Sequence, residues 1–148
     1  MTNAIMLHAT GGPDQLSWET VAVPEPGPDQ VAIRHTAIGV NYIDTYMRSG
    51  LYPVALPGVI GQQGVGVVTA LGANVSRFAT GDKVSYGSAP IGAYAGARVM
   101  GTDPLVKVPH GISDELAAAT QLRGMTAEYL LFRLYAVRPG DNIIVHAA

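Results

Sequence analysis

The fold is decided by a glycine run that leads into a β-branched strand, Gly61-Gln62-Gln63-Gly64-Val65-Gly66-Val67-Val68. The glycine spacing does not fit the dinucleotide-binding pattern G-x-G-x-x-G, and a strand rather than a helix follows the run. Glycines in such a strand are typical of a turn or a β-bulge, where the backbone bends or another segment approaches closely. The sequence therefore predicts a strand of a small curved β-structure here, and not a phosphate-binding loop.

Further short strands are predicted on both sides of this run, and glycine- or proline-bearing turns separate them. Residues 30–40 alternate apolar and polar side chains, as half-buried antiparallel strands do. A short helix is expected over residues 42–48. Strands of this length and spacing indicate a small barrel or sandwich. The predicted strands cover residues 4–8, 17–23, 30–40, 65–71, 83–86, 94–100 and 105–108.

The pattern changes after Pro109, where a helical segment begins. Ser113 is a favourable N-cap for this helix. Apolar side chains then recur at helical spacing, and the run Ile143–Val145 is typical of a buried strand. A strand-rich region followed by a helix and a buried strand predicts a mainly β domain that passes into a parallel α/β sheet.

The composition excludes several classes of protein. The chain has 148 residues, no cysteine and a net charge of −2, so disulfides and thiolate metal sites are excluded and no basic face is present for nucleic acid. No stretch approaches the roughly 20 apolar residues that span a bilayer, and no secretory signal precedes the first strand. A cytoplasmic protein that binds neither nucleic acid nor membrane is expected.

The richest candidate for a functional site is the segment Asn41-Tyr42-Ile43-Asp44-Thr45-Tyr46-Met47-Arg48-Ser49-Gly50-Leu51-Tyr52-Pro53. Three tyrosines, an amide, a carboxylate and a guanidinium are more polar groups than a core segment would carry. Asp44 and Arg48 stand four residues apart, so a local ion pair is expected, worth only about 0.3–0.5 kcal/mol if exposed.

Several motifs, in this order, resemble the zinc-free quinone oxidoreductase (zeta-crystallin-like) branch of the medium-chain dehydrogenase/reductase superfamily. The resemblance implies a GroES-like β-barrel catalytic domain over residues 1–123 and the incomplete start of a Rossmann-type nucleotide-binding domain over residues 124–148. The pyrophosphate-binding glycine loop would follow the last residues. The motifs are Ala37-Ile38-Gly39-Val40-Asn41, Ile43-Asp44-Thr45-Tyr46, Arg48-Ser49-Gly50-Leu51-Tyr52-Pro53, Gly92-Ala93-Tyr94, Leu122-Arg123-Gly124-Met125-Thr126 and His146-Ala147-Ala148.

The same resemblance implies hydride transfer from NADPH to a quinone without a metal. Zinc-dependent relatives have a cysteine at the position of Asn41 and a histidine at that of Gln62, and neither amide is a usual zinc ligand. By resemblance, Tyr46 and Tyr52 are the catalytic hydroxyl donors to the developing oxyanion.

Cofactor contacts follow from the resemblance as well. Asn41 is expected to bind cofactor or substrate through its two-faced amide, and Tyr46, Thr126 and Tyr129 complete the cofactor-binding set. Gln63 departs from the family, which commonly has a glutamate there, so the amide keeps an acceptor but lacks the charge.

Other interpretations remain open. The tyrosines can be packing residues, and an ordinary amphipathic helix explains Tyr129 equally well. Within the enzyme class, reduction of an enone or enoyl thioester competes with quinone reduction; outside it, a non-catalytic GroES-like binding or assembly module is the alternative. The 148-residue chain by itself is expected to be structurally incomplete, catalytically silent and a homo-oligomer, because its last strand and apolar helix face lack neighbours.

Overall fold

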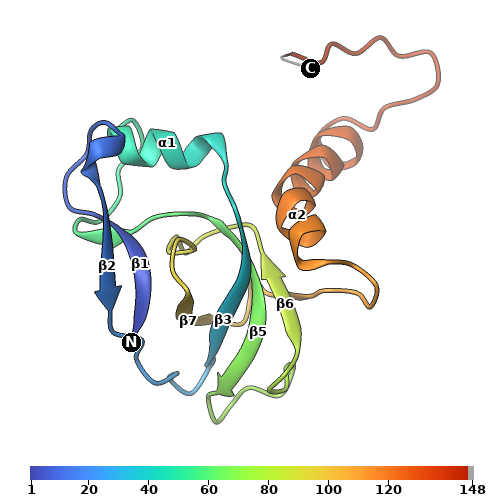
Figure 1. Ribbon diagram of the computed structural model, residues 1–148. Coiled ribbons are helices and arrows are strands. Elements are labelled where there is room, and N and C mark those ends of the chain that lie inside the picture. Colours follow the sequence, from blue (N-terminus) through green and yellow to red (C-terminus); the bar gives the residue numbers. More distant parts are fainter. Residues whose placement is uncertain (147–148) are drawn as a thin grey trace.

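A computed structural model describes residues 1–146 as a β-rich body carrying one short helix, with a second helix that projects from it (Figure 1). The mainly β architecture that the sequence predicts is confirmed. The strands are β1 (Thr2–Leu7), β2 (Leu16–Val21), β3 (Gln30–Gly39), β4 (Gly58–Val59), β5 (Gln63–Leu71), β6 (Lys83–Tyr86), β7 (Ala97–Gly101) and β8 (Val106–Lys107). The helical elements are the short 3-10 turn η1 (Pro13–Gln15), α1 (Tyr42–Ser49), α2 (Asp114–Glu128) and the π-helical η2 (Tyr129–Leu134).

The strands form two antiparallel sheets, ordered β2-β1-β4 and β7-β3-β5-β6-β8. Strand β3 lies in the interior of the larger sheet, because it pairs with β5 on one edge and with β7 on the other. The β3–β5 ladder shifts register twice, and such irregularities bend a sheet. Gly61 precedes β5 with a φ of +96°, a left-handed conformation that favours glycine. The prediction of a turn or a bulge at this glycine run is therefore confirmed by the turn at Gly61.

The hydrophobic core lies within the larger sheet and the loops that close it. Its members alternate along β3, at Val31 and Ile33, and along β6, at Val84 and Tyr86. Each fully buried aliphatic side chain contributes about 1.5–3 kcal/mol to folding. The core residues are Val31, Ile33, Val68, Phe78, Val84, Tyr86, Ala93, Met100 and Leu105.

Strand boundaries differ from the predictions where single contacts replace a ladder. The strand expected from residue 94 begins at Ala97, because Ala95 forms only an isolated bridge with Ala4. The strand expected over 105–108 is reduced to Val106–Lys107. Strand β4 was not predicted, since two residues carry no periodicity.

Helix α2 begins as the sequence predicts. The Ser113 hydroxyl oxygen accepts a hydrogen bond from the Leu116 N–H at 3.1 Å. Ala117 and Ala118 pack against Val65 of β5, so the first half of the helix is fixed to the larger sheet.

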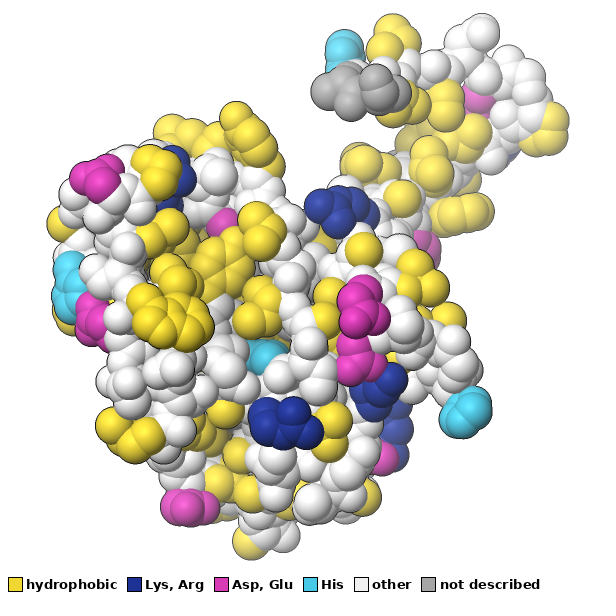
Figure 2. Space-filling model, in the orientation of Figure 1, with side chains coloured by type: hydrophobic (Ala, Val, Ile, Leu, Met, Phe, Trp, Pro, Cys, Tyr) yellow, Lys and Arg dark blue, Asp and Glu magenta, His cyan; other side chains and the backbone are white. Residues whose placement is uncertain are grey.

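The second half of α2 and the chain beyond it lie away from the sheets. Hydrophobic side chains gather there without cover (Figure 2). Residues 142–146 form no ladder, and Ile144 is 84% exposed. A buried parallel strand needs neighbours on its edges, and the described chain supplies none at this point, so the expected strand does not form. The expected motif residues Ala147 and Ala148 lie outside the described part. No helix within residues 1–146 is long and apolar enough to cross a membrane.

Candidate active site at helix α1

Helix α1 is held at both ends by its own sequence. Asn41 is the N-cap, and its backbone N–H donates to the Asp44 carboxylate oxygen Oδ2 at 2.9 Å. Gly50 ends the helix with a φ of +87°, which glycine adopts without strain. The helix buries Asp44 and Met47 on one face and exposes tyrosines on the other, so α1 has an inner and an outer face.

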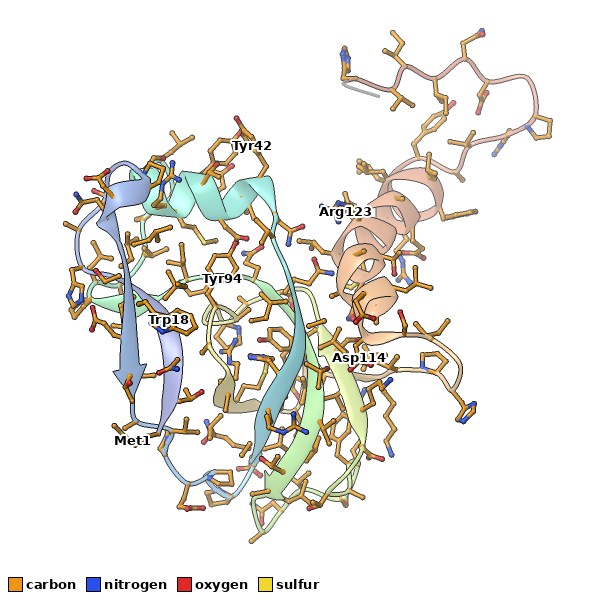
Figure 3. All side chains as sticks on the ribbon, viewed as in Figure 1. Met1, Trp18, Tyr42, Tyr94, Asp114 and Arg123 are labelled. Carbon is orange, nitrogen blue, oxygen red and sulfur yellow. The ribbon has the colours of Figure 1, made fainter. Side chains whose placement is uncertain are left out.

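The inner face carries a buried polar network of Asn41, Asp44, Gln63 and Tyr94, here called the Asp44–Gln63 network. The Tyr94 hydroxyl donates to Asp44 Oδ2 at 2.7 Å, and Asn41 Nδ2 donates to Gln63 Oε1 at 2.9 Å. Tyr94 lies beneath α1, between that helix and Trp18 (Figure 3). Burial, together with the bond to Asp44 and its charge, raises the pKa of Tyr94 well above its ordinary value. The phenol therefore remains a donor over the physiological range.

Two atoms of this network have no hydrogen-bond partner among residues 1–146. They are Asp44 Oδ1 and Gln63 Nε2, and both are fully buried. An orphaned buried polar atom costs about 1–3 kcal/mol. Native proteins keep few such atoms, and a pair of them beside one helix end is a feature that functional sites tolerate.

The expected ion pair between Asp44 and Arg48 is wrong. Asp44 is only 3% exposed and accepts hydrogen bonds inside the barrel. The Arg48 guanidinium instead donates through Nε to the Gly11 carbonyl at 3.2 Å. The spacing Asn41-x-x-Asp44 is that of a capping box, a signal in the sequence that could have placed Asp44 at the helix start.

The outer face carries a cluster of three tyrosines. The Tyr46 ring lies 5.2 Å from the Tyr42 ring and 5.5 Å from the Tyr52 ring, between ring centroids. The Tyr52 N–H donates to the Tyr46 carbonyl at 3.1 Å, which fixes the segment after the helix against it. Tyr52 is 46% exposed and Tyr46 is half-buried, and neither belongs to the core. The structure thus brings the two expected catalytic tyrosines together.

The other expected cofactor residues lie on the projecting helix. Thr126 is exposed, and its hydroxyl donates to the Leu122 carbonyl at 2.9 Å, so its oxygen can only accept from a ligand. Tyr129 follows three residues later at the start of η2 and is 51% exposed. No hydrogen bond within residues 1–146 joins either of them to Tyr46 or Tyr52.

Residues 1–146 contain no group of three or more His, Cys, Asp or Glu side chains placed to hold a metal ion. Asn41 and Gln62, the positions that the resemblance compares with zinc ligands, offer neutral amides.

A second buried polar cluster lies below the first, between β3, β6 and β7. His35 Nδ1 donates to the Ala95 carbonyl at 2.6 Å, so Nε2 accepts from the Tyr86 hydroxyl at 2.7 Å. Arg98 donates to that hydroxyl at 3.4 Å. Burial, reinforced by the Arg98 charge, lowers the pKa of His35 despite its bond to Ala95. His35 also lines a mainly apolar hollow of about 460 Å³ between Trp18 and Ile38. With both ring nitrogens occupied within the protein, His35 is a structural residue.

Comparison with known proteins places this geometry in a family. The chain matches the family model described as "Alcohol dehydrogenase GroES-like domain" over residues 27–140, and it belongs to that family. The GroES-like fold that the sequence motifs implied is confirmed.

Among its relatives, the chain is 46% identical to a quinone oxidoreductase of Pseudomonas aeruginosa and 42% identical to a 2-haloacrylate reductase of Burkholderia. Both matches cover the whole chain and 46% of the relative. The crystal structure of Escherichia coli quinone oxidoreductase complexed with NADPH superposes with a TM-score of 0.90 at 37% identity, over 93% of this chain and 42% of that one. The resemblance to quinone oxidoreductases is confirmed, and the chain spans about half the length of these curated relatives.

Proposed function

We propose that the protein to which this chain belongs transfers hydride from NADPH to a quinone without zinc, and that this chain supplies the catalytic hydroxyls. The observation that carries the proposal is the contact between Tyr46 and Tyr52 on the outer face of α1. The N-cap amide of the same helix, Asn41, stands where, by resemblance, zinc enzymes have cysteine. Two relatives named for quinone or haloacrylate reduction, and a neighbouring structure in complex with NADPH, support the same reaction class.

The residues present suit the nicotinamide end of such a cofactor. Asn41 and Thr126 have oxygen atoms able to accept from an amide or a hydroxyl, and Tyr46 and Tyr129 present exposed ring area for stacking. We propose these four residues as the cofactor-binding set of this chain. Bound NADPH would supply the hydride.

The tyrosines would act on the acceptor. Hydride addition leaves negative charge on a quinone oxygen, and a phenol within hydrogen-bond distance stabilises that charge and can pass on its proton. A quinone accepts hydride without a Lewis acid because its product is aromatic. An unactivated ketone, by contrast, needs its oxygen polarised by a group such as a metal ion. A site built from two phenols and amides therefore favours an acceptor that is already electron-poor.

Reduction of an electron-poor alkene is the second candidate. The 42% identity to a 2-haloacrylate reductase favours it, since the same phenols would protonate the carbanion that hydride addition creates. A non-catalytic GroES-like module is the third interpretation, and the same assay tests it.

The test uses protein from the complete reading frame, because the relatives are about twice as long as this chain. NADPH oxidation is followed with an uncharged 1,4-quinone, an enone and 2-chloroacrylate, each with and without a chelator. Quinone-dependent turnover that survives the chelator is expected. Turnover abolished by chelator and restored by zinc would contradict the metal-free mechanism, and no turnover with any acceptor would favour the binding module.

We further propose that the nucleotide-binding domain begins near residue 124. The apolar side chains of the projecting helix and tail support this division, because they need a covering surface. In the 148-residue chain alone, a second copy would supply that cover. Sedimentation showing a monomer of this span would contradict the oligomer.

A further inference from the structure

The amide of Asn41 is held in a single orientation by acceptors inside the protein. Its Nδ2 donates to Gln63 Oε1 at 2.9 Å and, more weakly, to the Gly39 carbonyl at 3.4 Å. A primary amide has two N–H protons, and both are used here. Its oxygen faces the Asp44 N–H in the capping box, a contact that takes at most one of two lone pairs. What Asn41 can still offer a ligand is a lone pair.

The reverse orientation of the amide is unfavourable. Rotation by 180° would place the Asn41 oxygen against the Gly39 carbonyl, two acceptors without a proton between them. In the observed orientation, Gln63 must present its own oxygen to the Asn41 amide nitrogen, and this leaves Gln63 Nε2 without a partner. The orphaned donor is thus the consequence of fixing Asn41.

The backbone at Gly39 leaves room for the Gln63 side chain to reach Asn41. A Cβ atom at Gly39 would lie 2.5 Å from Gln63 Oε1, so only glycine in β3 allows the contact. Gln63 itself is completely buried, and its side chain therefore cannot serve as a ligand contact. Its role is exerted through Asn41, which is 9% exposed.

We propose that Gln63 is a positioning residue that makes Asn41 a hydrogen-bond acceptor toward the ligand. Asn41 then selects a ligand with an N–H or O–H donor, namely the carboxamide of a nicotinamide or a hydroxyl of its ribose, and it does not bind the carbonyl oxygen of a quinone. This inference rests on the proposed function and narrows the two-faced role that the sequence suggested for Asn41.

The first experiment measures equilibrium dissociation constants, in protein from the complete reading frame, for NADPH and for its 3-acetylpyridine analogue, which lacks the carboxamide N–H. One neutral hydrogen bond corresponds to roughly fivefold in affinity. Wild-type protein should favour NADPH about fivefold, and Asn41→Ala should remove that preference. Equal weakening of both ligands by Asn41→Ala would identify a ribose hydroxyl as the donor. Unchanged affinity for both ligands would overturn the proposal.

The second experiment tests the role of Gln63. Gln63→Met has nearly the same volume and removes the orphaned donor, so the fold should persist. It should bind NADPH roughly fivefold more weakly, because the Asn41 amide loses the stronger of the two acceptors that fix its orientation and keeps only the weaker contact with the Gly39 carbonyl. Gln63→Glu keeps an acceptor for Asn41 and should bind like wild type. Gln121→Met, the same change on α2, is the matched control and should also bind like wild type.

A Gln63→Met variant with wild-type affinity and wild-type preference between the two ligands would overturn the positioning role. The two proposals fail separately. NADPH binding without turnover of any acceptor would overturn the proposed reaction, and the affinities of the variants could still be compared. Absence of NADPH binding would overturn both the proposed reaction and the positioning role of Gln63.

Discussion

The two faces of α1 differ in how completely the surrounding protein determines them. On the inner face, Asp44 is 3% exposed and receives hydrogen bonds from Asn41 and from Tyr94, which lies in a loop fifty residues away. On the outer face, the Tyr46 ring contacts the rings of Tyr42 and Tyr52, Tyr46 is half-buried, and Tyr52 is 46% exposed. The inner face should therefore control stability and orientation, while the outer face should be free for chemistry.

Loss of a hydroxyl on the outer face should give the largest effect, and it should appear in the rate alone. Tyr46→Phe or Tyr52→Phe, in protein from the complete reading frame, is expected to lower quinone turnover by roughly 10–10³-fold, because a donor to the developing oxyanion is lost. The free energy of unfolding should stay within about 0.5 kcal/mol of wild type, as for other surface changes. Steady-state kinetics and urea unfolding measure the two quantities. Unchanged kinetics in both variants would make the tyrosines packing residues.

Removal of the carboxylate on the inner face should produce the opposite pattern. Asp44→Ala leaves the Tyr94 hydroxyl and the Asn41 N–H without an acceptor, and each orphaned donor costs about 1–3 kcal/mol. We expect the free energy of unfolding to fall by about 3 kcal/mol in urea titrations. Asp44→Asn is the matched control, since its oxygen can still accept both bonds, and it should lose about 1 kcal/mol. An Asp44→Ala variant as stable as wild type would remove the distinction between the faces.

Loss of the Tyr94 hydroxyl should have a smaller effect that depends on pH. Tyr94→Phe removes one hydrogen bond to a carboxylate, which corresponds to about 1.5–3 kcal/mol. Because the folded protein raises the pKa of Tyr94, its contribution is complete below the ordinary tyrosine value of about 10 and is lost as pH rises above it. The stability difference between wild type and Tyr94→Phe should therefore shrink in alkaline buffer. A difference that stays constant to about pH 11 would contradict this assignment.

The sequence predicts the outer face of α1 better than the inner face. Tyr46 and Tyr52 stand close together in the chain, so their clustering is a local signal. The partners of Asp44 and Asn41 are set by tertiary structure, since Tyr94, which bonds to Asp44, comes from a distant loop and Gln63, which bonds to Asn41, comes from β5. The i,i+4 rule led to an ion pair with Arg48, but it applies to exposed helix faces, whereas this carboxylate faces the barrel. Whether Asp44 pairs with Arg48 or with Tyr94 depends on the burial of Asp44. Periodicity over one short helix does not reveal that burial.

The fold, too, has parts that the local sequence predicts and parts that depend on tertiary neighbours. Alternation of apolar and polar residues located β3, because one of its faces is buried against the core. The glycine run and the β-branched residues after it located β5. Short elements such as β4 form only because another strand, here β1, lies beside them and pairs with them. Residues 142–146 show the reverse case, an apolar run typical of a strand that forms no ladder without neighbours.

The smallest expected effect comes from the second buried cluster, which provides a comparison for the first. Tyr86 donates to His35 Nε2, and the Arg98 guanidinium lies beside the same hydroxyl. The folded protein lowers the pKa of His35, so its contribution to stability is complete above the ordinary histidine value of about 6.5 and is lost as pH falls below it. Wild type should lose stability between about pH 7.5 and about pH 5.5 more steeply than His35→Gln, which does not titrate. Thermal unfolding at both pH values measures the difference. Equal losses of stability in wild type and in His35→Gln would show that the folded protein tolerates a proton on His35. This cluster, unlike the Asp44–Gln63 network, would then not depend on a fixed pattern of donors and acceptors.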